Sequence, residues 1–402
     1  MASLERALPQ ATAVVGAPAK GSGDLARLRL VTGLSLILIT MIGLLGADWD
    51  IQWHAVIGRD RTFTPPHDLI LIGIGLSGIV ALVSILIETR LTRRYPDLQA
   101  YSTEFLDILH SSLGLYLVGF GAVCSAVAFP LDTYWHSLYG IDISLWAPFH
   151  TMIYMGGVLS SIGVIYLLLS AAHLAEMQQE RWTAWLSYAS LIVALGILLS
   201  KFSTFLTPAL KGYQLHLGFL TLNFFPILLA ATAVFVCVLT VRLVPWTGAA
   251  SMVVIVFLLI FLLVSAFVPP MMTLLVQAEH ETYLARASRI GSTIVPLSGQ
   301  TPVLLLLTLS LDAVVWLGRR GRWALTKRHT WELIVTLVSI FLIAGFILIQ
   351  LDVSGRAVRG GGGGMGRFAL SLLLSLLLTI PGSLLGNWVA RSISQTVQAL
   401  RR

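Results

Sequence analysis

Charged side chains are scarce in this sequence: they make up 11% of its 402 residues, whereas hydrophobic residues make up 56%. A soluble protein of this length needs more polar side chains to cover its surface, so the composition excludes an ordinary soluble domain. Cysteine is almost absent too, with Cys124 and Cys237 far apart in the chain. Two isolated thiols provide neither a disulfide framework nor a CxxC metal motif, and both are expected to be packing residues.

Long apolar runs take the place of the missing charges, and the mean hydropathy is +0.86. Several runs reach roughly eighteen residues or more, the length that lets a helix cross about 30 Å of hydrocarbon. They lack the alternation of barrel strands, so they predict an all-α, polytopic integral membrane bundle of about ten helices. The expected spans are 30–53, 67–88, 105–129, 148–172, 183–204, 217–242, 249–269, 301–317, 331–350 and 368–390.

Three regions follow from this pattern. Residues 1–29 are rich in Ala, Gly and Pro and are expected to form a flexible cytoplasmic tail. Residues 30–172 form a four-helix membrane region, and residues 173–402 form a six-helix membrane region of unknown role. Between the seventh and eighth spans, the segment that carries Glu279, His280 and Glu281 predicts an amphipathic interfacial helix.

Lys and Arg fall unevenly on the two sides of the predicted membrane. Seventeen of the 26 basic residues lie on the side of the N-terminus. The positive-inside rule therefore predicts that both termini are cytoplasmic, in a bacterial or archaeal cytoplasmic membrane. The net charge of +7 reflects this topology, so no nucleic-acid partner is expected.

Two predicted outer loops share one sequence pattern. The first reads DWDIQWHAVIGRDRTFTPPH (48–67) and the second LDTYWHSLYGIDISLWAPFH (131–150). Each contains Asp-x2-Trp-His-x3-Gly-x-Asp followed by Pro-x-His, and the second has one extra residue before its proline. This order of residues predicts a duplicated helical hairpin, of the kind common in polytopic membrane proteins.

The spacing brings metal-ligand side chains together at the outer edge of the membrane. Asp50 and His54 are four residues apart and share one face at the end of span 1. Pro65 and Pro66 suit the first turn of a helix, which puts His67 close to them at the start of span 2. Two imidazoles and one carboxylate form a ligand set for Cu, Fe or Zn. The second copy repeats this set with Asp132, His136 and His150.

The other polar residues of these segments have weaker interpretations. Arg59 and Asp60 are expected to support the ligands, whereas Asp48 and Arg61 are expected at a solvated edge. Trp53 and Trp135 are typical of the aromatic belt at a membrane interface. His216 and His280 lie in later outer segments; each is more simply a solvated loop residue than an extra ligand or proton relay. A solvated loop also stays open as the explanation of the two motifs themselves.

The first motif resembles the C subunit of the copper-containing membrane monooxygenases, the particulate methane and ammonia monooxygenase family. In that subunit an Asp-x3-His precedes an Arg-Asp pair, a Phe-Thr-Pro and a second His. The resemblance implies that Asp50, His54 and His67 are copper ligands. The second motif is similar to a downstream segment of the same subunit, with His136 and His150 matching its histidines and Asp132 standing where we expect Asn.

The resemblance covers roughly residues 30–172 and leaves the last six spans unexplained. It implies a copper-dependent enzyme subunit that hydroxylates ammonia, methane or a short alkane with O2. Copper is the implied cofactor, with Fe or Zn less favoured, and A- and B-type subunits and a quinol electron donor are the implied partners. A metal or small-solute transporter stays open as an alternative, because internal repeats and paired ion ligands also describe permeases. A non-catalytic metal-binding scaffold is the third.

Overall fold

The computed structural model describes residues 19–57, 63–140, 146–210, 214–217, 220–282, 301–321, 330, 334–335 and 364–399. This part of the chain is mostly helical, as the sequence predicts. The helices that come first are α1 (Ser22–Val56), α2 (Pro65–Arg94), α3 (Leu113–Tyr139), α4 (Pro148–Met177) and α5 (Arg181–Leu210). Those that follow are α6 (Phe225–Leu243), α7 (Ala249–Ala278), α8 (Thr301–Arg319), α10 (Gly364–Leu377) and α11 (Thr379–Ala399).

Seven segments of the described chain are long and apolar enough to cross a membrane. They are α1, α2, α3, α4, α7, residues Arg181–Phe205 of α5 and residues Ala369–Gln395 of α10 and α11. A shorter apolar helix, Ala230–Leu243, lies within α6. A helical membrane protein is therefore the architecture, while the count of about ten spans stays a prediction. The expected span 331–350 falls outside the described residues except for 334–335.

Two expected spans begin later than hydropathy indicates. Ahead of α3, a 3-10 helix (Pro96–Tyr101) leads into an antiparallel hairpin of β1 (Thr103–Phe105) and β2 (Leu109–Ser111). Ahead of α6, β3 (Gln214–Leu217) pairs with β4 (Leu220–Asn223). The sequence predicts helix in both segments, because a short apolar run does not distinguish a strand from a helix.

Two other boundaries also differ from expectation. The first helix begins at Ser22, so residues 22–29 of the expected tail are helical, and residues 1–18 lie outside the described chain. The interfacial helix expected to carry Glu279 and His280 is not formed around them, because α7 continues through Pro269 and Pro270 and ends at Ala278. Both residues follow that helix end, and residues 283–300 are outside the described chain.

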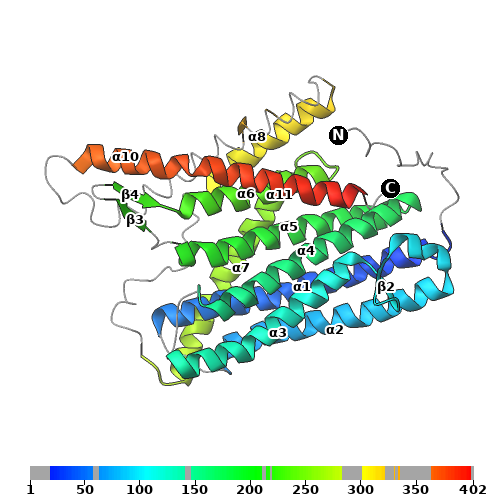
Figure 1. Ribbon diagram of the computed structural model, residues 1–402, viewed down its shortest axis with the longest axis horizontal. Coiled ribbons are helices and arrows are strands. Elements are labelled where there is room, and N and C mark those ends of the chain that lie inside the picture. Colours follow the sequence, from blue (N-terminus) through cyan, green and yellow to red (C-terminus); the bar gives the residue numbers. More distant parts are fainter. Residues whose placement is uncertain are drawn as a thin grey trace, which may run out of the picture.

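The first four helices form a closed ring. α1 contacts α2 and α4, and α3 contacts the same two helices, while α5 packs on the outside against α1 and α4. Figure 1 shows these helices running along the long axis of the molecule. Consecutive helices alternate in direction, so the ends of α1, α3 and α5 lie with the starts of α2, α4 and α6 at one end of the bundle. The β1–β2 hairpin lies at the other end.

Glycines allow the two helices of each hairpin to approach closely. A Cβ atom at Gly73 of α2 would lie 2.9 Å from Gly43 Cα of α1. A Cβ atom at Gly121 of α3 would lie 2.4 Å from the carbonyl oxygen of Gly156 of α4. Small residues of this kind are typical of helix contacts in membranes, where packing replaces the hydrophobic driving force.

A buried ion pair ties three of these helices together at the end that carries β2. Arg29 of α1 donates from Nε to Glu88 Oε1 and from Nη2 to Glu88 Oε2 of α2, both at 2.9 Å. Its Nη1 atom donates to Ser170 Oγ of α4 at 2.5 Å. Glu88 also accepts from Ser111 Oγ at 3.1 Å and from the Ser112 backbone N at 2.8 Å. The side chains of Arg29 and Glu88 are 0% and 1% exposed, so the pair is desolvated, and each partner also hydrogen-bonds neighbouring groups.

A second, exposed pair lies at the same end. Arg27 donates from Nη2 to Glu180 Oε1 at 2.7 Å, and the two side chains are 63% and 24% exposed. The hydrogen bond from Arg27 holds the pKa of Glu180 below its usual range. The pair gives a solvent-exposed counterpart to the buried one.

Candidate metal centres

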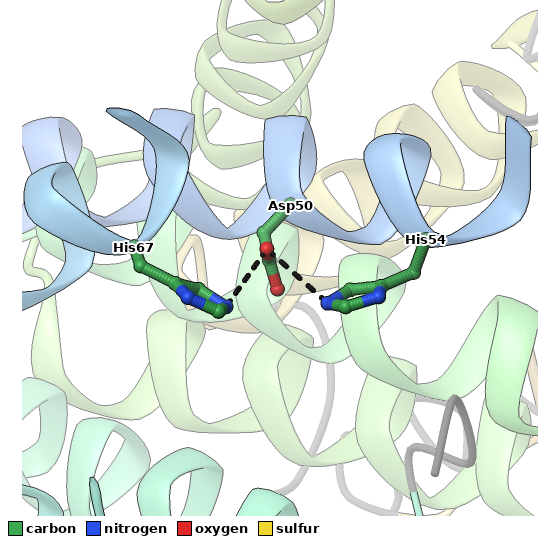
Figure 2. Close-up of side chains that lie close together, drawn as sticks. All are labelled: Asp50, His54 and His67. Carbon is green, nitrogen blue, oxygen red and sulfur yellow. Dashed lines mark ion pairs between the residues drawn. The ribbon is translucent and has the colours of Figure 1, made fainter. Parts of the chain in front are cut away.

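Asp50, His54 and His67 converge at the junction of α1 and α2. Asp50 and His54 lie one turn apart in the last part of α1, and His67 is the third residue of α2. Pro65 and Pro66 begin that helix, as the sequence predicts. Asp50 Oδ1 lies 3.1 Å from His67 Nε2 and 3.5 Å from His54 Nε2. Figure 2 shows the carboxylate between the two imidazoles, which approach it from opposite sides.

Asp132, His136 and His150 repeat this arrangement at the junction of α3 and α4. Asp132 and His136 lie in the last turns of α3, and His150 is the third residue of α4, after Pro148 at the start of that helix. Asp132 Oδ2 lies 3.1 Å from His150 Nε2 and 3.3 Å from His136 Nε2. The two triads therefore agree within 0.2 Å in both distances.

The donor atoms of each triad fit around one metal ion. They lie within 4.8 Å of one another in both groups. A metal about 2.0–2.2 Å from each ligand holds those ligands roughly 3 to 4 Å apart, which matches the carboxylate–imidazole distances. The Oδ1 atom of Asp132, which is not the oxygen that faces the two imidazoles, is buried and accepts no hydrogen bond within the described residues. Side-chain exposure of 12% to 20% leaves all six residues sheltered but reachable.

Both triads border one cavity of about 510 Å³. Asp50, His54 and His67 line one part of it, and Asp132 and His150 line another. The remaining lining is largely apolar and comes from α1 to α5. Helix α5 belongs to the region 173–402, for which the sequence predicts no role. It lines the same cavity as α1 to α4, so the expected boundary at residue 173 separates residues that share one cavity.

The two triads are close neighbours. The ring of Phe129 in α3 lies 5.6 Å from the ring of His67, edge to face. Phe129 is one turn before Asp132 and lines the same cavity, so it contacts the first triad from the helix that carries two residues of the second. His150 of the second triad is near enough to interact electrostatically with Asp50 of the first. A charge bound at one triad would therefore be felt at the other.

The structure corrects two expectations for the first motif. Asp48 is not at a solvated edge: it is partly buried and its side chain hydrogen-bonds Thr204 of α5. Trp53 is 4% exposed and packs in the core of the bundle rather than in an interfacial belt. Helical phase explains both, because the residues of α1 that do not face the triad face α5 and the core. Arg59, Asp60 and Arg61 lie outside the described residues, so their expected roles stay predictions.

The remaining sequence candidates lie away from the triads. His216 is exposed on β3, opposite Thr221 of β4, and His280 is exposed in the turn after α7. Within the described chain, neither belongs to a group of three possible ligands. Trp135 is partly buried and packs against Tyr139 and Phe149. Cys124 and Cys237 are both free thiols, in agreement with the prediction.

Sequence reasoning missed Lys201 and Tyr154, which line the cavity together with Thr204. Lys201 lies in the apolar segment Arg181–Phe205 of α5. A charged residue inside a predicted span is a functional candidate by default, and this signal was available in the sequence. Nothing in the sequence pairs Tyr154 of α4 with a residue of α5, so only the fold brings these side chains to one cavity.

Comparisons with known proteins leave the chain without an assigned family. No family model, no curated protein and no solved structure matches it.

Proposed function

We propose that this chain is a copper-binding subunit of a membrane monooxygenase, which uses O2 to hydroxylate a small substrate such as ammonia, methane or a short alkane. The observation that carries the proposal is the pair of Asp/His/His triads that open onto one largely apolar cavity. A carboxylate and two imidazoles leave coordination positions open for a reacting molecule. An apolar cavity among membrane helices admits small apolar molecules from the bilayer.

The choice of metal comes from the ligand set and from the resemblance of the two motifs. Two His and one carboxylate suit Cu, Fe or Zn. Zn has no redox chemistry, so it does not serve O2 activation. The resemblance of the Asp50–His67 segment to the copper-ligand motif of the C subunit favours copper over iron. A redox metal bound there would supply the one-electron chemistry that O2 requires.

The reaction balances with a quinol as the reductant. One oxygen atom of O2 enters a C–H or N–H bond of the substrate, and the other leaves as water. The two electrons and two protons that this requires come from oxidation of the quinol to a quinone. The chain's own residues would hold the metals at the edge of the cavity and keep bulk water out of it.

The position of the triads favours an enzyme over a transporter. All six ligand residues lie at the same end of α1 to α4, whereas transporters bind their substrates near the middle of the membrane. The opposite end of the bundle carries Arg93 and Arg94 of α2 and Arg181 of α5. By the positive-inside rule, that distribution supports cytoplasmic termini and triads on the extracytoplasmic side. A- and B-type subunits are the partners that the resemblance implies.

A single turnover tests the proposal without a quinol or partner subunits. The full chain in lipid nanodiscs is loaded with Cu(I), since two reduced ions hold the two electrons of one hydroxylation. Oxygen-18 gas and butane are then added, and butanol is measured by mass spectrometry. We expect labelled butanol from the copper-loaded chain and none from the Zn-loaded chain.

Variants connect the product to the triads. His67→Ala and His150→Ala each remove one site, so we expect either change to abolish labelled butanol. His280→Ala alters an exposed histidine outside both triads and is the matched control, which should react as the unmodified chain does. A copper-loaded chain that holds both ions and yields no labelled alcohol would contradict a hydroxylation that depends on the two triads of this chain alone.

A further inference from the structure

The shared cavity is much larger than the substrates named above. Its volume of about 510 Å³ lies in the range of sites that hold molecules of drug size, whereas methane or ammonia would fill a small part of it. Most of its lining is apolar, which fits a hydrocarbon body. The polar side chains of the lining outside the triads therefore indicate which polar group a ligand of this cavity carries.

Lys201 brings a cation to this lining. Its Nζ atom donates to the carbonyl oxygen of Gly157 in α4 at 2.8 Å, and it has no ion-pair partner among the described residues. An ammonium group among membrane helices is costly unless a counter-charge compensates it. The carboxylates that line the cavity, Asp50 and Asp132, belong to the triads. Gly157 leaves open space beside the ammonium, since a Cβ there would have Lys201 Nζ, at 3.6 Å, as its nearest described neighbour.

Tyr154 adds a second hydrogen-bond donor to the same lining. Its hydroxyl is buried and has no hydrogen-bond partner within the described chain. Its ring stacks on Phe205 with centroids 3.9 Å apart and planes 12° from parallel. Phe205 is one turn after Lys201 on α5, and Tyr154 is one turn before Gly157 on α4. The phenol and the ammonium thus lie on facing helices, and both lack an anionic acceptor.

We propose that the cavity binds an alkyl carboxylate, with its carboxylate at Lys201 and Tyr154 and its chain directed toward the triads. This inference rests on the metal sites of the proposed function and goes beyond it, because it assigns to the same cavity a ligand larger than the small substrates named there. A triad that binds a divalent ion with one carboxylate has a net charge of +1, so a loaded cavity that also holds Lys201 favours an anion. An uncharged alkane would leave both donors without a partner.

Helix geometry sets the length of the chain. Gly157, the contact of Lys201, is seven residues after His150 on α4, which corresponds to about 10 Å along the helix axis. With C–C bonds of about 1.5 Å, an extended alkyl chain advances roughly 1.25 Å per carbon. A carboxylate with about eight carbons would therefore reach from Lys201 to the level of the second triad.

Octanoate binding to the Zn-loaded full chain in nanodiscs tests this assignment, because zinc prevents turnover. Equilibrium dialysis with radiolabelled octanoate gives the affinity, and empty nanodiscs give the blank for partition into lipid. We expect one saturable site per chain. Lys201→Met keeps the length of the side chain and removes its charge, and we expect octanoate to bind about tenfold more weakly or worse. Gly157→Leu fills the space beside the ammonium of Lys201. It should weaken octanoate binding although residue 201 is still lysine.

Octan-1-ol is the matched ligand, and we expect Lys201→Met to leave its affinity unchanged. Zinc content measured on the same samples separates this inference from the proposed function. Unchanged zinc with no saturable octanoate binding, or with equal octanoate affinity in Lys201→Met, would overturn the alkyl carboxylate and leave the metal centres standing. Saturable octanoate binding that depends on Lys201 in a chain that binds no metal would instead overturn the metal centres alone.

Discussion

Replacement of Glu88 by glutamine removes the anion that neutralises the buried guanidinium of Arg29. Glu88 accepts two hydrogen bonds from Arg29 at 2.9 Å, and two more from Ser111 Oγ and Ser112 N. Both charged side chains are 1% exposed or less. The change leaves an uncompensated buried charge and turns an NH2 group toward existing donors. Breaking a buried pair in this way costs about 3–5 kcal/mol of the free energy of unfolding.

Reversible unfolding of the metal-free chain in mixed detergent micelles, followed by circular dichroism, measures this cost without a contribution from bound ligand. Glu180→Gln breaks the exposed pair with Arg27 and serves as the matched control, for which we expect a loss of less than about 1 kcal/mol. The double variant Arg29→Met/Glu88→Met removes both charges, so it should be more stable than Glu88→Gln. A Glu88→Gln chain that unfolds like the Glu180→Gln control would refute the reasoning.

Three other outcomes are expected. Gly121→Leu forces α3 away from α4 and should destabilise the chain by roughly 1–3 kcal/mol in the same unfolding experiment. Gly119→Leu is the control and should not destabilise it, because a Cβ atom at Gly119 has open space around it. Equal losses of stability in the two variants would contradict the close contact between the helices. Because Arg27 lowers the pKa of Glu180, that pair stabilises the fold above the usual pKa of 4.5 and the effect is lost as the pH falls below it. The stability difference between the unmodified chain and Glu180→Gln should therefore shrink in acid, and a difference that grows there would be evidence against it. Asp132→Asn keeps an oxygen ligand but removes its charge. Competition with a chelator should therefore show that this variant binds metal more weakly than the unmodified chain and more strongly than Asp132→Ala. Equal metal affinity in the Asp132→Asn and Asp132→Ala variants would contradict this expectation.

The two Asp/His/His triads could be predicted from the sequence because their geometry is local. Asp50 and His54 are fixed by helical spacing, and the Pro65–Pro66 start of α2 places His67 at the same junction. The second motif follows the same rule at the junction of α3 and α4. Such features depend on residues within about twenty positions of each other, so pattern and spacing suffice to anticipate them.

Features that depend on contacts between distant segments could not be predicted. The cavity needs α5 to pack against α1 and α4, and no periodicity specifies that arrangement. Lys201 was visible as a charge within a span, yet its contact with Gly157 comes from tertiary packing. The same holds for Arg29 and Glu88, which are 59 residues apart and appear in the sequence as ordinary residues near the ends of two spans. Hydropathy also hid the β1–β2 and β3–β4 hairpins, since strand and helix cores share apolar residues.

The metal content of the purified chain tests the central claim most directly. The full chain in nanodiscs is loaded with Cu(II), freed of loosely bound ions and analysed by inductively coupled plasma mass spectrometry. The two triads predict two copper ions per chain, and the prediction for His67→Ala or His150→Ala is one ion per chain in each variant. The His67→Ala/His150→Ala double variant should hold none, and His280→Ala should keep two. A chain that holds the same copper as the double variant would contradict the assignment of Asp50, His54, His67, Asp132, His136 and His150 as metal ligands.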